Sequence, residues 1–208
     1  LAGRDMLRKH INHPPDSFEA LVEVQDTIRF WSVHHRLWPE NVLNGTLVML
    51  DKYFDSADPV TAPPAGLPLL ITSFFQKIFN KQEFFLIRFS LSHLADLFKG
   101  CIQLTRIAEM EGVPALLQRE LKLVSEELDH RLVESIVAID KQTKVNDLIH
   151  LNYKARRELK NRVCRITHSF AKMDAWPSMA LATVEHGWTF PELKPGVPVC
   201  LHAEGLFH

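Results

Sequence analysis

Cysteine is scarce in this sequence, and long apolar runs are absent. Three cysteines occur in 208 residues, and Cys101, Cys164 and Cys200 are far apart and odd in number. They fit reduced thiols of a cytosolic protein better than a disulfide framework. No apolar run reaches the roughly 18 residues that indicate a membrane span. The formal net charge of −1 gives no argument for nucleic acid or a membrane surface as a bulk electrostatic partner. We therefore expect a cytoplasmic location and no membrane partner.

The motifs that carry catalysis are also missing. The sequence has no Gly-rich loop of the phosphate-binding type and no Gly-x-Ser-x-Gly turn. It has no His-Glu-x-x-His and no Cys-x-x-Cys, although histidines number eleven. His34 and His35 are neighbours and would point about 100° apart on a helix, so they cannot easily share one ion. We predict no catalytic, cofactor-binding or metal-binding residues, and a histidine-dependent metal hydrolase is the weakest alternative.

Helical periodicity dominates what is present. Apolar residues recur at three- and four-residue steps, as in Phe84, Ile87, Leu91 and Leu94. Helices are expected over about 16–38, 41–54, 67–79, 81–111, 115–139, 146–173 and 177–187. The fifth could break near Asp129-His130, and a turn is expected at 174–177. The prolines after Trp188 predict extended chain with room for one short strand. The expected fold is an all-α bundle of long and short helices with a short extended C-terminal segment.

One basic cluster occurs, between Lys154 and Arg165. On one continuous helix, Arg157, Lys160 and Arg165 fall roughly along one side and are candidates for phosphate contacts. The alternative, which we favour, is a solvated helix face on which Glu158 reaches Arg162 at the i,i+4 spacing.

The C-terminal part carries motifs of a known family. The segments Asp174-Ala-Trp-Pro-Ser-Met-Ala-Leu-Ala182 and Glu185-His-Gly-Trp-Thr-Phe-Pro-Glu192 are followed by Glu204-Gly-Leu-Phe-His208. Together they resemble the junction that precedes the ATPase domain in the MutS family of DNA mismatch-repair ATPases. Near the start, Met6-Leu-Arg-Lys-His-Ile-Asn-His-Pro14 and Val24-Gln25-Asp26 resemble the opening of that family's core domain, with Val24 where Arg is usual.

The resemblance implies an all-α core, or lever, domain over residues 1–187. Residues 188–208 would then be an extended junction that leads to an ATPase domain beyond His208. Only about 115–146 lies between the flanking long helices, so the family's clamp domain looks absent or reduced, as in short MutS-like paralogues. By resemblance, the parent protein is a DNA-dependent ATPase that uses ATP and Mg, engages DNA and forms a homodimer, whereas this part of it is not an enzyme.

Five residues are expected to shape the junction. Trp176 and Pro177 would fix the angle between two helices, and Gly187 would end the second helix in a left-handed conformation. Phe190 and Pro191 would dock the exit segment against the helices. The alternative reading is a self-contained α-helical interaction module whose apolar 67–79 segment packs against a partner.

Overall fold

The computed structural model describes residues 2–55 and 81–196, and within these ranges the chain is all-α with no strand. The α-helices are α1 (Ala2–Asn12), α2 (Phe18–His34), α3 (Asn44–Asp55), α5 (Lys81–Thr105), α6 (Ala115–Leu128), α7 (Arg131–Val137), α8 (Val145–Glu158) and α9 (Lys160–His186). Two 3-10 turns, His35–Leu37 and Arg106–Glu109, extend α2 and α5. The predicted 67–79 helix and the predicted strand after residue 196 lie outside the described residues.

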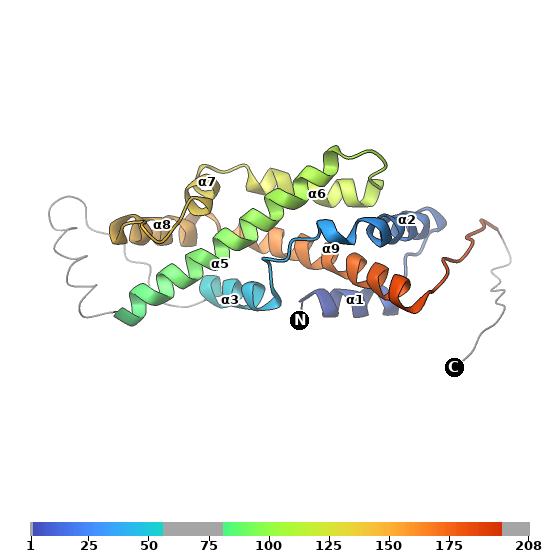
Figure 1. The fold of residues 1–208 in the computed structure, drawn as a ribbon, viewed down its shortest axis with the longest axis horizontal. Helices are drawn as coiled ribbons and strands as arrows, with labels where there is room; N and C mark the ends of the chain where they lie inside the picture. Colours follow the sequence, from blue (N-terminus) through green and yellow to red (C-terminus); the bar gives the residue numbers. More distant parts are fainter. Residues whose placement is uncertain (1, 56–80, 197–208) are drawn as a thin grey trace.

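The described helices form an elongated body around two long ones (Figure 1). Helix α5 contacts α3, α6, α7 and α8, whereas α9 contacts α1, α2, α3, α6 and α8. Helix α6 therefore lies against both long helices. Helices α7 and α8 lie toward one end of the body, and α1, α2 and the end of α9 lie toward the other (Figure 1).

Local sequence explains where several helices begin and end. The Ser17 hydroxyl oxygen accepts a hydrogen bond from the Ala20 amide at 3.1 Å, which caps α2 as expected from a serine at this position. Gly187 has φ 63° and ψ 30°, the left-handed conformation predicted for it. The amides of Gly187 and Trp188 donate to the carbonyls of Val184 and Thr183, which satisfies the last turn of α9.

Apolar side chains from both long helices form a continuous core. Trp31 of α2 and Trp176 of α9 are fully buried, and Phe98 of α5 is 1% exposed. Because such residues recur along α5 and α9 at helical spacing, the core follows the long axis of the body.

Two predicted boundaries were wrong. The expected 146–173 helix is divided at Leu159 into α8 and α9. The expected turn at 174–177 does not exist, because α9 continues through Pro177 to His186. Proline removes one backbone hydrogen bond from a helix interior, but Trp176, Pro177 and Ala180 are buried, and this burial favours the uninterrupted helix. Trp176 and Pro177 therefore do not set an angle between two helices.

Candidate functional site: two facing helix breaks

The first break separates α6 from α7 at Asp129 and His130. Asp129 leaves the helical conformation at ψ 78°, and His130 is extended at φ −154° and ψ 133°. The His130 Nδ1 atom accepts a hydrogen bond from the Leu132 amide at 3.2 Å, so the imidazole caps α7 in place of the usual Ser or Asp. With Nδ1 accepting, the ring proton of neutral His130 resides on Nε2.

The second break, at Leu159, is gentler. Leu159 has φ −106° and ψ −10°, away from ideal helical values. Its amide still donates to the Ala155 carbonyl at 2.9 Å, and its carbonyl accepts from the Val163 amide at 2.8 Å. The Leu159 side chain is fully buried. The two helices thus share a bent but hydrogen-bonded joint, with an apolar anchor at the bend.

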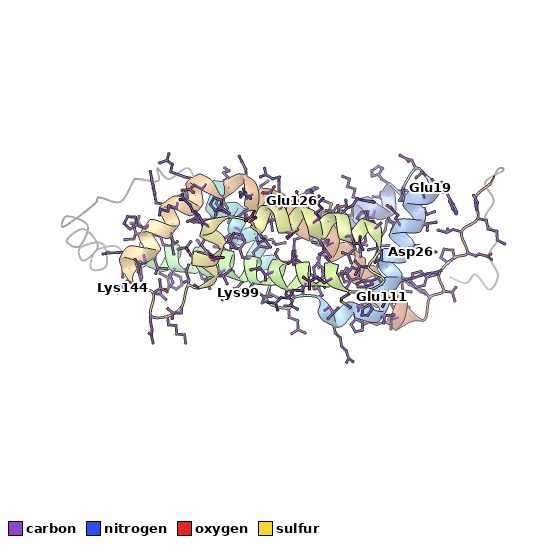
Figure 2. All side chains as sticks on the ribbon, turned by 90° about the horizontal axis from the view of Figure 1, so that it is seen from above. Glu19, Asp26, Lys99, Glu111, Glu126 and Lys144 are labelled. Atoms are coloured by element: carbon purple, nitrogen blue, oxygen red, sulfur yellow. The ribbon has the colours of Figure 1, made fainter. Side chains whose placement is uncertain are left out.

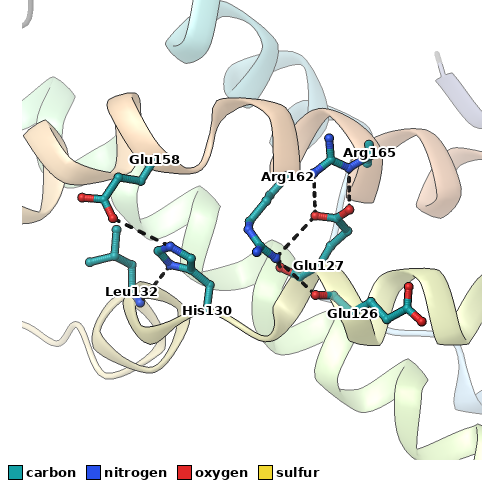
Figure 3. A network of polar contacts seen from close by, with 7 residues as sticks. All are labelled: Glu126, Glu127, His130, Leu132, Glu158, Arg162 and Arg165. Carbon is teal, nitrogen blue, oxygen red and sulfur yellow. Dashed lines mark hydrogen bonds and ion pairs between the residues drawn. The ribbon is translucent and has the colours of Figure 1, made fainter.

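Arginines from the first turns of α9 hold the end of α6 (Figure 3). Arg162 Nη1 donates to the carbonyl oxygens of Glu126 at 3.2 Å and Glu127 at 3.1 Å. These carbonyls belong to the last turn of α6, where helices leave acceptors unsatisfied and favour cations. Arg165 forms a two-pronged contact with the Glu127 carboxylate, with Nη2 and Oε2 2.9 Å apart. Arg162 Nη1 also lies 3.5 Å from that carboxylate.

A second set of polar contacts joins α7 to the end of α8. The Glu158 carboxylate lies 3.3 Å from Arg131 Nη2 and 3.7 Å from His130 Nε2. Glu158 therefore does not pair with Arg162, and that sequence prediction was wrong. The helix break turns Glu158 toward α7 and Arg162 toward α6, as Figure 3 shows. We call this set of contacts the joint network; it consists of Glu126, Glu127, His130, Arg131, Glu158, Arg162 and Arg165.

Within the joint network, the electrostatics favour the ionised forms of Glu127 and Arg165. The hydrogen bond from Arg165 is the main cause that lowers the pKa of the Glu127 carboxyl, and the charges of Arg165 and Arg162 add to it. The same contact raises the pKa of the Arg165 guanidinium. Glu127 is 19% exposed, so it is screened less than a free surface carboxylate.

The three candidate phosphate-contacting residues do not share a helix. Arg157 belongs to α8 and donates to the Tyr153 hydroxyl. Lys160 belongs to α9 and donates to the Phe54 carbonyl at 3.0 Å and to Asp55 Oδ1 at 3.3 Å. Arg165 is held by Glu127. Each of the three basic groups therefore has a partner within the chain. The sequence did not indicate these partners, because it predicted one continuous helix.

The exit segment after Gly187 lies against α2. The Phe190 ring packs against the core, and the Arg29 guanidinium lies 5.0 Å from its centroid. Gln25 Nε2 donates to the Pro191 carbonyl at 2.7 Å. The exit segment is therefore fixed to α2 by a ring contact and a hydrogen bond.

Sequence reasoning missed most of the joint network. Glu127 carried no expected role, and His130 was noted only as a point where a helix could break. The charge pattern carried one usable signal, because two arginines at positions 162 and 165 stand one turn apart and could hold one acidic group. Nothing in the pattern placed that group on α6.

The ion pairs and hydrogen bonds of the joint network can hold the ends of α6 and α8 when they are formed and release them when they are broken. Among the residues that the structure describes, no group of three or more His, Cys, Asp or Glu side chains could hold a metal ion. In the described ranges, no helix is both long and apolar enough to cross a membrane.

Comparisons with protein-family models, curated proteins and solved structures found no match for the chain.

Proposed function

We propose that this chain is the lever domain of a MutS-like ATPase, a connector that transmits motion between a nucleotide-binding domain and parts that engage DNA. The observation that carries the proposal is α9, an uninterrupted helix of 27 residues between the joint at Leu159 and the cap at Gly187. At about 1.5 Å per residue it is a rod of about 40 Å. It touches α1, α2, α3, α6 and α8 along its course.

The two facing breaks supply the place where such a lever would bend. A rigid rod transmits motion only if the chain flexes elsewhere, and hinges use a few residues at element ends. As α8 and α9 change their angle, the contacts of the joint network can either persist or be replaced by other contacts. Support from the sequence comes from the resemblance of residues 174–192 and 204–208 to the family's junction.

The proposal assigns the remaining functions to the parent protein. ATP and Mg would bind a domain that follows His208, because the present sequence has no phosphate-binding loop. DNA engagement and homodimer formation would likewise belong to the full-length protein, in the cytoplasm. The gene sequence after His208 tests this. We expect a proline, then a strand and Gly-x-x-x-x-Gly-Lys-Ser/Thr within roughly a hundred residues. A stop codon at that point would refute the proposal.

Distances between spin labels in the longer protein test the lever itself. We would replace Lys154 of α8 and Glu185 of α9, both exposed, with labelled cysteines after Cys164→Ser and Cys200→Ser, which leave only the buried Cys101 of the native thiols. Their separation should differ between the ATP- and ADP-bound states. The matched control pair, His168 and Glu185, lies within α9 and should keep one distance. An α8–α9 separation that is identical in every nucleotide state would contradict a bending joint.

A second function, a helical interaction module, has its own supporting observation. Phe85, Leu86 and Phe89 on α5 are 62%, 55% and 37% exposed, and the two phenylalanine rings stack at 5.7 Å. Exposed apolar clusters favour association. If they mediate self-association, sedimentation should show dimers that the double variant Phe85→Ser, Phe89→Ser abolishes. A monomer at all concentrations would remove this support.

A further inference from the structure

A small hollow lies between the start of α3 and the second half of α9, away from the joint network. Its volume is about 240 Å³. Its walls come from the chain that leaves the first 3-10 turn, from the N-terminal part of α3 and from one face of α9: Trp38, Pro39, Glu40, Val42, Leu43, Asn44, Leu47, Phe170 and Asp174. Phe170 and Asp174 are four residues apart on α9 and therefore share that face.

Asp174 is the distinctive group in this hollow. Its side chain is partly buried, and among the described residues no side chain or amide forms a hydrogen bond or ion pair with the carboxylate. Burial raises the pKa of the Asp174 carboxyl, and the positive charge at the amino terminus of the chain lowers it by a smaller amount. A partly buried carboxylate without a hydrogen-bond partner is less well stabilised than one in water, so a cation that reached it would be stabilised.

The charges around the hollow select the sign of a ligand. Two carboxylates, Asp174 and Glu40, border it, and no Lys, Arg or His stands among the described residues that line it. The N-terminal turn of α3 opposes them with the equivalent of about half a positive charge. Apart from the amino terminus, whose charge also acts on Asp174, no positive side chain of the described lining offsets the two carboxylates, which favours a cation and disfavours phosphate or carboxylate ligands.

The apolar walls of the hollow determine the shape of the ligand that fits it. Trp38 is partly exposed and lines the hollow, and its ring packs at 4.9 Å and 46° on the buried Phe170, so Trp38 is the aromatic group that can meet a cation and its alkyl chain. Val42, Leu43 and Leu47 continue the apolar wall. The volume is below the roughly 300 Å³ at which pockets for drug-sized ligands begin. A group of few atoms, polar at one end and aliphatic along its stem, fits this combination.

We propose that this hollow is a binding site for a primary alkylammonium group, with Asp174 as its anion and Trp38, supported by the buried Phe170, as its aromatic wall. Such a group can belong to a small free amine or to the lysine side chain of a partner. This proposal is independent of the lever function, because it uses neither the joint nor a following domain.

Nuclear magnetic resonance of the whole chain tests the site. The protein would carry ¹⁵N-labelled tryptophan and an acetylated amino terminus, so that its own ammonium does not compete, and the Trp38 indole signal would be assigned with Trp38→Phe. Butylammonium should shift this signal with saturation, whereas butanol, which has the same alkyl chain without the charge, should not. A short blocked peptide with one lysine forms the second arm. Binding of butylammonium alone indicates a free amine, and binding of both indicates that a partner's lysine can enter.

The variant Asp174→Asn separates this site from general association. It should weaken butylammonium binding about tenfold, the loss expected of one charged hydrogen bond. The control Asp51→Asn removes an exposed carboxylate of α3 that does not line the hollow and should bind as the original chain does. Circular dichroism would verify that both variants are folded. Equal binding by Asp174→Asn, equal shifts with butanol, or no saturable shift would each overturn the proposal.

Discussion

Gly100 of α5 illustrates how one residue sets the approach of two segments. A β-carbon at this position would collide with the Val42 side chain and lie 3.3 Å from Asn41 Oδ1 and Pro39 Cβ. The chain that leads into α3 can therefore cross α5 only because residue 100 has no side chain. The neighbouring amide of Asn41, which donates from Nδ2 to the Asp96 carbonyl at 2.8 Å, depends on the same approach.

We expect Gly100→Ala to lower the free energy of unfolding by up to about 2 kcal/mol net, because an overpacked contact usually costs about 1–3 kcal/mol. This cost should outweigh the gain of about 1 kcal/mol that alanine brings to a helix interior. Urea denaturation measures the difference. Gly45→Ala in α3 is the matched control, because nothing lies within 4 Å of its β-carbon position. It should be neutral or stabilising, and a stable Gly100→Ala variant would show that the crossing can adjust.

At the residue scale, sequence could predict the caps but not the joint. Ser17 and Gly187 were predictable because their conformations follow from local chemistry. Leu159 was not, since it is a good helix former and the bend there coincides with a buried side chain and polar contacts to α6 and α7. The prediction at Pro177 was wrong for the opposite reason. Proline usually ends a helix, but the burial of Trp176 and Ala180 favours a continuous helix here.

Among elements, the Glu127 carboxylate is one of the polar links between α6 and α9, beside the ion pair of Glu120 with Lys172. We expect Glu127→Gln to lower the free energy of unfolding by up to about 1 kcal/mol at neutral pH, as for partly exposed ion pairs. Because the folded-state pKa of Glu127 lies below its ordinary value of 4.5, the stabilisation is present above that pH. It is lost as the pH falls through the lowered pKa, so the difference between variant and original should shrink as the pH falls below 4.5.

Denaturant titrations at several pH values would measure this dependence. Glu126→Gln is the control, because the Glu126 side chain is exposed and only its carbonyl contacts Arg162. It should change stability little at any pH. If both variants behaved alike, the carboxylate of Glu127 would have no special part in holding α6 to α9.

The order and type of the elements followed from periodicity over most of the described chain. α2, α5, α6 and α7 were predictable because their apolar stripes are strong and their ends carry Ser17, Pro39 or Gly112. The joint network was not predictable, because its contacts connect residues up to 38 positions apart. Spacing along a helix carries no information about such pairs.

For the whole molecule, charge of both signs is spread along the body. Glu19, Asp26, Lys99, Glu111, Glu126 and Lys144 are distributed along its length in Figure 2. The formal net charge is −1, and the three candidate phosphate-contacting residues are already engaged. In the part of the chain that the structure describes, these observations give no argument for attraction of a nucleic-acid backbone.

We therefore expect the isolated chain to bind duplex DNA weakly at about 0.15 M salt, with a shallow dependence on salt concentration. Fluorescence anisotropy with a labelled duplex, repeated over a salt series, measures both. Arg157→Gln should leave the signal unchanged. Tight binding with a steep salt dependence, reduced by this substitution, would instead identify the end of α8 as a phosphate-contacting surface.

The placement of α9 also has a consequence for how the chain folds while it is being synthesised. Helices α1 and α2 leave the ribosome first, yet both pack on α9, which begins at residue 160. Short helices are marginal in water without tertiary contacts. Helix α1 must therefore wait for α9, and α2 has only its smaller contact with α6 until then, whereas α6 and α7 can each pack on α5 earlier. A translational pause between α7 and α9 would prolong the exposure of the apolar side chains of α2, including Trp31.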